Sequence, residues 1–328
     1  MKYRETMLSL TLAIILLVAP LLACAQQPAK APRIGVLGGQ TASAMAPLMD
    51  ALRQGLRELG YKEGENITFE YRYAEGNINR FPGFVDEMLR LKVDVILAPG
   101  GSQSVLAAKK ATSTIPIVFI GSTDPVAAGL VPSLERPGGN VTGLTIGYPG
   151  LYGKRAELLK ETILGLSRVG LLFNSAQSSV PLDELRNLTQ TLALQFQSLD
   201  VRSPNDFDSA FEAATKAQTG GLIVANNSPM TTYPKRIVEL SAKSRLPAIY
   251  SDEFSYSAGG LMAYIPSRAD LFRRSATYID KILKGAKPGD LPVEQPKKID
   301  LLINLKAAQQ IGLTIPQSVI NRADEVIR

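Results

Sequence analysis

Histidine is absent from this chain of 328 residues, and its absence excludes more functions than any motif suggests. Ser-His-Asp and Cys-His catalysis both require an imidazole, and so does every metal site with a histidine ligand. No phosphate-binding Walker loop or dinucleotide-binding glycine fingerprint is found either. We therefore expect no bound metal, no cofactor and no enzymatic activity that depends on histidine.

Tryptophan is also absent, and cysteine occurs once. The single cysteine, Cys24, rules out an intrachain disulfide bond. The lysines and arginines give a formal net charge of +6, but they are scattered along the chain. A nucleic-acid surface would need a concentrated basic stripe with aromatic residues between the charges. We therefore expect no nucleic-acid partner.

The first 25 residues predict a signal peptide. Lys2 and Arg4 precede an apolar run over residues 8–22, which is shorter than the roughly 20 apolar residues of a transmembrane helix. Residues 21–24, Leu-Leu-Ala-Cys, resemble a bacterial lipobox, in which Cys24 would carry the lipid and begin the mature protein. Residues 23–25, Ala-Cys-Ala, equally fit an ordinary signal peptidase site. Residues 26–32 then form a polar tether.

Short apolar runs alternate with helical patterns through the rest of the chain. The runs are residues 34–37, 93–97, 115–120, 141–144, 169–173, 222–225 and 248–250, and the helical patterns are residues 47–59, 104–113, 182–196, 237–243 and 269–283. Continuous apolar strands that alternate with helices indicate parallel sheets covered on both faces. The length suits two domains of about 100–150 residues each. We predict an α/β protein with two Rossmann-like lobes and a ligand cleft between them.

Two segments of similar pattern support the two lobes. Residues 93–124 and 220–252 each predict a strand, a small polar loop, a helix and a second strand that begins at a proline, Pro116 or Pro247. Breaker residues near 147–150, 258–260 and 287–292 suggest three crossings between the lobes. The predicted first lobe contains residues 33–146 and 261–287, and the second contains 147–260 and 288–328. Several crossings make a hinge that closes on a ligand.

Small and polar residues follow the predicted strands, where open α/β sheets bind their ligands. The candidate ligand-binding residues are Gln40, Thr41, Ser43, Gly101, Ser102, Gln103, Ser122, Thr123, Asp124, Asn174, Ser175, Asn226, Asn227 and Asp252. Hydroxyl groups and helix-start amides suit a carboxylate, and Asp124 or Asp252 suits an ammonium group. A free amino acid carries both groups.

Each candidate also has a structural interpretation. Ser43, Ser102 and Ser178 can be helix caps, and Asp124 before Pro125 is typical of a helix start or turn. Asn226 and Asn227 can form a simple turn. Four tyrosines, at positions 71, 73, 148 and 152, suit a cleft wall, but packing in the core or on the surface is the commoner role for such residues.

Three segments resemble a known family, namely residues 114–131 (TIPIVFIGSTDPVAAGLV), 137–143 (PGGNVTG) and 291–327. They are similar to the ABC transporter substrate-binding proteins that include the tryptophan- and phenylalanine-binding proteins. The resemblance implies a fold like that of type I periplasmic binding proteins, with three crossovers and an amino-acid-like ligand. It implies ligand contacts from the loops at Ser102 and Asp124 in the first lobe. The corresponding loops of the second lobe are those at residues 174–175, 226–227 and 252. The first loop, GGQTAS, departs from the aromatic-amino-acid binders.

The resemblance also implies partners and a location. We expect a monomer in the periplasm, or on the outer face of the cytoplasmic membrane, that serves an ABC permease and its ATPase. A periplasmic sensor module for a signalling partner and an enzyme that works without histidine are the alternatives.

Overall fold

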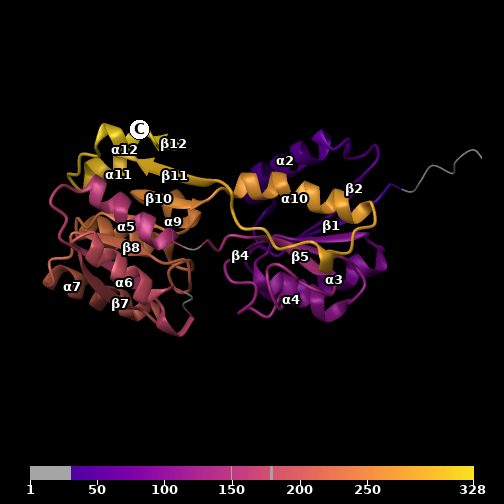
Figure 1. The fold of residues 1–328 in the computed structure, drawn as a ribbon, viewed down its shortest axis with the longest axis horizontal. Coiled ribbons are helices and arrows are strands. Elements are labelled where there is room, and N and C mark those ends of the chain that lie inside the picture. The colour runs from indigo at the N-terminus through magenta and orange to yellow at the C-terminus, as the bar shows by residue number, and fades with distance from the viewer. Residues whose placement is uncertain (1–30, 149, 178–179) are drawn as a thin grey trace, which may run out of the picture.

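The computed structural model describes residues 31–148, 150–177 and 180–328, which form two lobes joined by a narrow waist (Figure 1). In both lobes a sheet is covered by helices, and all but one pair of neighbouring strands run parallel. The fold class predicted from the sequence is confirmed. The expected signal peptide, Cys24 and most of the tether lie outside the described residues.

The first lobe contains a five-stranded parallel sheet in the order β2-β1-β3-β4-β5. Its strands are β1 (Arg33–Gly38), β2 (Thr68–Tyr73), β3 (Val95–Ala98), β4 (Ile117–Ser122) and β5 (Val141–Thr145). Its helices are α2 (Ala42–Glu58), α3 (Phe81–Arg90), α4 (Ser102–Ala111) and α10 (Arg268–Leu283), with the 3-10 turns η1 (Ile78–Arg80) and η4 (Pro288–Asp290). Apolar residues of α2 and α10 form one core against the sheet, and those of α3 and α4 form another.

The second lobe contains a seven-stranded sheet in the order β12-β11-β10-β9-β8-β6-β7. Its strands are β6 (Arg168–Phe173), β7 (Gln195–Asp200), β8 (Gly221–Val224), β9 (Ala248–Tyr250), β10 (Met262–Pro266), β11 (Ile299–Asn304) and β12 (Glu325–Ile327). Its helices are α5 (Leu151–Thr162), α6 (Leu182–Thr191), α7 (Phe207–Lys216), α8 (Pro234–Lys243), α9 (Glu253–Ser257), α11 (Leu305–Gln310) and α12 (Gln317–Ile320), with the 3-10 turns η2 (Ser175–Gln177) and η3 (Pro204–Asp206). Strand β11 runs antiparallel to β10.

The start of α2 shows how local sequence sets an element. Thr41 caps this helix by accepting a hydrogen bond of 3.3 Å from the amide of Ala44. Met45, Leu52 and Leu56 then recur on the buried face at helical spacing. The helix thus begins five residues before the apolar pattern at 47–59 predicts, because the cap and the first turn are polar or small.

The repeated pattern in the sequence corresponds to a repeated unit in the structure. Strands β3 and β4 are parallel neighbours joined through α4, and β8 and β9 are parallel neighbours joined through α8. Pro116 and Pro247 stand directly before β4 and β9. In each unit the second strand is followed by a loop that contains an aspartate, Asp124 after β4 and Asp252 after β9. The two lobes thus carry equivalent loops on the sides that face each other.

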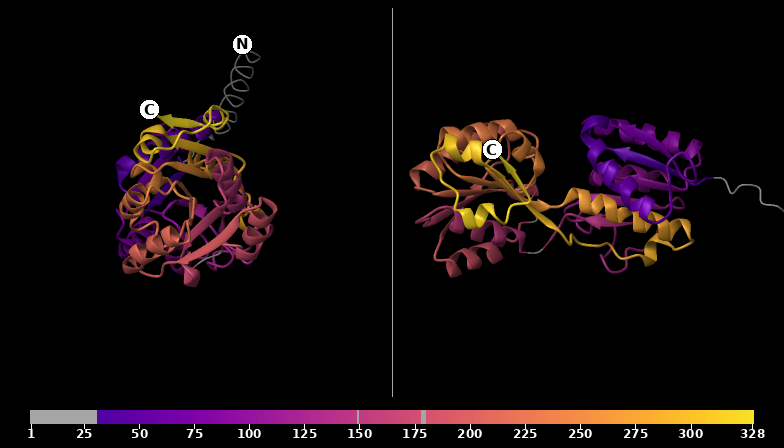
Figure 2. Two further views of the ribbon diagram at one scale, coloured as in Figure 1. Left: turned by 90° about the vertical axis from the view of Figure 1, so that its left-hand side faces the viewer. Right: turned by 90° about the horizontal axis from the view of Figure 1, so that it is seen from above.

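Two of the predicted lobe crossings need correction. Strand β10 belongs to the second sheet, so the chain crosses at residues 266–268 rather than at 260/261. After η4 the chain stays on the first lobe, because Val293 packs in its core and Glu294 bridges to Leu144. It returns between residues 295 and 299 rather than at 287/288. Figure 2 shows this return in the view from above, where the chain runs from the first lobe into β11.

The sequence patterns also missed five strands. Strand β2 alternates polar and apolar residues and β7 is mostly polar, and neither was predicted. Strands β10, β11 and β12 were not predicted either. The helix predicted at 182–196 ends at Thr191, and the chain then enters β7 at Gln195. Ala193 between them has a φ of 54°, a left-handed conformation that cannot continue a helix.

Candidate functional site

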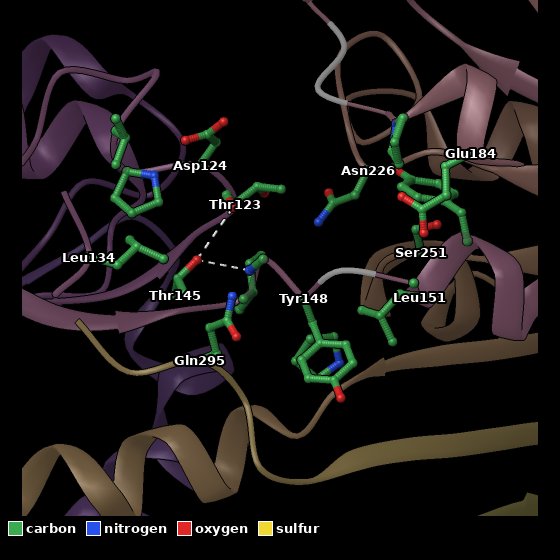
Figure 3. Close-up of a pocket in the computed structure, with 18 of the residues that line it drawn as sticks. Thr123, Asp124, Leu134, Thr145, Tyr148, Leu151, Glu184, Asn226, Ser251 and Gln295 are labelled. Carbon is green, nitrogen blue, oxygen red and sulfur yellow. Dashed lines mark hydrogen bonds between the residues drawn. The ribbon is translucent and has the colours of Figure 1, made fainter. Parts of the chain in front are cut away.

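A cleft lies between the lobes, where the carboxyl ends of the strands face each other (Figure 3). It has two adjoining parts with volumes of about 380 and 310 Å³, which are sizes suited to a small ligand. Both parts are lined by Thr123, Ile146, Asn226, Ser251 and Pro266. The larger part, here the α5 side, reaches the start of α5, and the smaller part, here the α9 side, reaches α9.

The α5 side combines carboxylates, apolar surface and one buried cation. Asp124 reaches it from the first lobe and Glu184 from α6 of the second, on opposite sides of the cleft in Figure 3. Val126 and Tyr148 add exposed apolar surface, with 43% and 48% of their area exposed. Arg155 of α5 completes the wall while only 3% of its surface is exposed.

Arg155 lies beneath Tyr152 at the start of α5. Its Nε and Nη2 atoms donate to the carbonyl oxygen of Tyr264 over 3.0 and 2.8 Å, and its guanidinium lies 5.0 Å from the centre of the Tyr152 ring. Burial lowers the pKa of Arg155 to about 10, so it stays charged at neutral pH. Burial likewise raises the pKa of the Tyr152 phenol.

The α9 side is bounded by glycine loops of the first lobe and by α9 of the second. Gln40 and Gly101 line it from the first lobe. Glu253 and Arg268 form an ion pair of 3.1 Å across the second crossing, which links α9 to the start of α10. Phe254 beside them leaves 43% of its surface exposed.

Asp124 and Asp252 hold the same local role in the two repeated units. Asp124 Oδ1 accepts from the amide of Ala127 over 2.9 Å, and Asp252 Oδ1 accepts from the amide of Ser255 over 2.8 Å. Asp252 also accepts from the hydroxyl of Ser255, and burial raises its pKa. Both aspartates thus stabilise a turn or a helix start, and both line the cleft.

The structure brings only part of the predicted set to the cleft. The predicted residues that line it are Gln40, Gly101, Thr123, Asp124, Asn226 and Asp252, and those that do not are Thr41, Ser43, Ser102, Gln103, Ser122, Asn174, Ser175 and Asn227.

Most residues of the second group have partners within their own lobe. The amides of Asn174 and Asn227 bond to each other's backbone or side chain. Ser175 donates its amide and hydroxyl to Asp200. These contacts shape the loops that carry Asn226.

Thr41, Ser43, Ser102 and Ser122 also act locally. The hydroxyls of Thr41 and Ser43 lie 3.1 Å apart at the start of α2, and those of Ser102 and Ser122 lie 3.1 Å apart between α4 and β4. Ser43 is not the cap of its helix, because Thr41 is. Gly101 rather than Ser102 precedes α4, with a φ of 78° that favours glycine. Ser178 lies outside the described residues.

Sequence reasoning missed several residues that line the cleft. Arg155 and Glu184 lie on helices, whereas the rule for open sheets indicates only the loops that follow strands. Arg268 was missed because the second crossing was placed too early. Tyr148 and Tyr152 line the α5 side, while Tyr71 and Tyr73 stack on β2 away from it. The start of α5 directly after the breaker residues 147–150 is the signal that could have found Tyr152 and Arg155.

Within residues 31–148, 150–177 and 180–328, no group of three or more cysteine or acidic side chains is arranged to hold a metal ion. In the same ranges, no helix has both the length and the apolar character needed to cross a membrane.

The model of the ABC transporter substrate binding protein family matches residues 34–327. The chain belongs to this family. The resemblance seen in three sequence segments is therefore confirmed for nearly the whole described chain. The family consists of substrate-binding proteins rather than enzymes, and such proteins serve an ABC permease on the extracytoplasmic side of the membrane.

Relatives of the family support the same fold and role. A tyrosine-binding protein of Clostridioides difficile (strain R20291) is 27% identical over 288 residues, which are 85% of this chain and 82% of that protein. A structure from Streptococcus pneumoniae in complex with L-Trp is 26% identical, has a TM-score of 0.75 and covers 90% of this chain and 99% of that one. A conserved domain protein from Vibrio cholerae is 28% identical, has a TM-score of 0.74 and covers 90% and 100%.

Proposed function

We propose that this protein is the receptor of an ABC importer for a free α-amino acid, which it encloses between its lobes. The observation that carries the proposal is the pair of carboxylates, Asp124 and Glu184, on opposite walls of the α5 side (Figure 3). Relatives with bound or named amino-acid ligands support the same ligand class.

The facing carboxylates favour a ligand with a cationic group. Closure of the lobes brings these walls together, and like charges that approach one another repel. An ammonium group between Asp124 and Glu184 turns that repulsion into two attractive, charge-assisted contacts. Asp124 has its Oδ1 engaged with Ala127, which leaves Oδ2 for such a contact. Lobe closure is therefore favoured when a cationic ligand is present.

Apolar surface in the same part of the cleft suits the rest of an amino acid. Val126 and Leu134 line it from the first lobe, Leu151 from the second, and Tyr148 from the crossing between them. Val126 and Tyr148 stay exposed there, and exposed apolar residues that gather at a cleft are typical of a binding site. The cleft thus offers carboxylates for an ammonium group and an apolar wall for the side chain of one small amino acid.

The remaining parts of the proposal concern assembly and location. We infer a monomer that is tethered by lipid on Cys24 to the outer face of the cytoplasmic membrane. It delivers its ligand to the permease without changing it chemically. Support comes from the lipobox-like residues 21–24 and from the family, whose members bind rather than convert their substrates. The ligand recovered after incubation should therefore be unaltered.

A screen of the twenty common L-amino acids by thermal shift, followed by calorimetry, tests the proposal. A ligand present at 100 times its Kd should stabilise the protein by about 2.7 kcal/mol, which raises the melting temperature by several degrees. The N-acetyl derivative of the best binder serves as the control, because it has the same side chain and no ammonium group. Failure of all twenty to bind, with a sugar or nucleoside recovered from the purified protein, would overturn the proposal.

A further inference from the structure

Arg155 is a buried cation without an anionic partner among the described residues. It contacts the carbonyl of Tyr264 and the ring of Tyr152, and no carboxylate oxygen comes within ion-pair distance. A guanidinium has five N–H groups, and the carbonyl of Tyr264 engages only Nε and one N–H of Nη2. Nη1 has no hydrogen bond to any described residue.

An unpaired charge in such a position is costly. Burial of an ion removes its hydration, and proteins normally compensate with an ion of opposite charge. Asp252 favours the charged form of Arg155 through its electrostatic field, but both of its oxygens bond to Ser255 at the start of α9. The compensation is therefore incomplete in the protein alone.

A second positive feature lies at the same place. Helix α5 begins at Leu151, and its cap position is Gly150, which has no side chain to accept from the first amides. The first turn contains no acidic residue. The N-terminus of a helix carries a partial positive charge and attracts anions. Gly150, Leu151 and Arg155 all line the α5 side of the cleft, so the two positive features meet at one wall.

We propose that Arg155, together with the start of α5, binds the carboxylate of the ligand. This inference rests on the proposed function, since it takes the ligand to be an amino acid. The carboxylate supplies the counter-charge that Arg155 lacks, and Nη1 donates to it. The ammonium group then lies toward Asp124 and Glu184, the carboxylates of the same part of the cleft. The loop hydroxyls that the sequence suggested for the carboxylate, such as Ser102, contact other protein groups instead.

The wild-type protein provides the first test, through two ligands that differ only at the carboxylate. The best-binding amino acid of the screen is compared with its primary amide by calorimetry. The amide keeps the ammonium group, the side chain and nearly the same shape, but it has no negative charge. We expect the amide to bind at least about 100-fold more weakly, because it leaves the buried guanidinium unpaired. Equal affinity for acid and amide would overturn the inference while the proposed function stands. If no amino acid binds at all, both fail together.

Variants of Arg155 identify the residue responsible. Arg155→Gln should weaken binding of the acid by about 100-fold and reduce the acid-to-amide preference to less than about tenfold. Arg155→Lys keeps the charge but loses the planar fork, and it should bind with intermediate affinity. Arg168→Gln is the matched control, because Arg168 begins β6 at the end of the sheet away from the cleft and contacts Gln195. A full acid preference in folded Arg155→Gln would contradict the assignment.

A crystal structure of the wild-type complex decides the question even if the variants do not fold. The inference requires a carboxylate oxygen of the ligand about 3 Å from Nη1 of Arg155. A carboxylate that instead binds the loop at Gly101, with Arg155 unchanged, would overturn it.

Discussion

Asp124→Asn separates a role in ligand binding from a role in the local turn. The change removes the negative charge but keeps a carbonyl-type oxygen that can accept from the amide of Ala127, as Oδ1 does over 2.9 Å. Asparagine forms such side-chain turns about as readily as aspartate, so the stability of the variant should stay within about 0.5 kcal/mol of wild type. The main effect of the variant should therefore be a loss of ligand affinity, with little change in stability.

The expected loss of affinity follows from the exposure of the carboxylate. A hydrogen bond to a charged group is worth about 1.5–3 kcal/mol, and the half-buried position of Asp124 places its contact near the lower limit. A loss of about 1.4 kcal/mol corresponds to a tenfold increase in Kd. Titration calorimetry with the amino acid from the screen, together with a thermal melt of the same sample, measures both quantities.

Two further variants complete this experiment. Asp124→Ala also removes the acceptor of the Ala127 amide, and it should cost about 1 kcal/mol of stability in addition to the loss of affinity. Asp183→Asn is the control, because Asp183 neighbours Glu184 on α6 but is 94% exposed and pairs with Arg186. An unchanged Kd for Asp124→Asn would leave Asp124 as a turn residue only. The ammonium contact would then have to come from another carboxylate of the cleft, Glu184 or Asp252.

Three other changes test the hinge, a buried carboxylate and the anchor. Gly147→Ala places a Cβ atom 2.0 Å from the carbonyl oxygen of Thr123 at the first crossing, so it should destabilise the protein by about 1–3 kcal/mol in denaturant melts. Gly83→Ala, with open space around it in α3, should be neutral or stabilising, and equal effects of the two would refute the packing argument. Burial raises the pKa of Asp252, so native stability falls as the pH rises above the ordinary aspartate range of about 4. Asp252→Asn should gain stability relative to wild type over that rise, and a constant difference would contradict this. Cys24→Ala should move the protein from the membrane fraction to the soluble periplasmic fraction, and equal solubility of both forms would exclude the lipid anchor.

The interior of both lobes could be predicted from the sequence because buried parallel strands are continuously apolar. Residues 34–37 and 169–173 are examples, and they form the centres of β1 and β6. A strand that mixes polar and apolar residues carries no such signal. In β2 every residue is half-buried, and Phe69 and Tyr71, which stack on each other, alternate with polar residues. Pattern reasoning therefore found β1, β3, β4 and β5 of the first sheet and β6, β8 and β9 of the second, and it missed β2, β7, β10, β11 and β12.

The candidate site was predictable only where it follows a central strand. Thr123 and Asp124 follow β4, and Asn226 follows β8, and all three line the cleft, where the rule for open sheets expects residues that follow strands. The same rule included Asn174 and Ser175, whose side chains turn to partners in their own lobe. The direction in which a side chain points depends on its hydrogen-bond partners, and the sequence alone does not show which residues those are.

Arg155 shows the other limit of sequence reasoning. An arginine within a polar helical stretch suggests a solvated surface, and only the three-dimensional contacts with Tyr152 and Tyr264 reveal that it is buried. Arg155 lines the cleft because α5 begins directly after the first crossing between the lobes. The sequence alone does not show where this helix lies.

Small-angle X-ray scattering with and without the amino acid found in the screen tests the central claim most directly. Three crossings, near residues 146–150, 266–268 and 295–299, join the lobes, and the ion pair between Glu253 and Arg268 spans the second of them. Rotation about so few crossings requires few changes of backbone torsion. We predict that a saturating amino acid lowers the radius of gyration, because the walls that carry Asp124 and Glu184 approach each other. A radius of gyration that stays the same at saturation, with binding verified by calorimetry on the same sample, would contradict a ligand enclosed by closure of the two lobes.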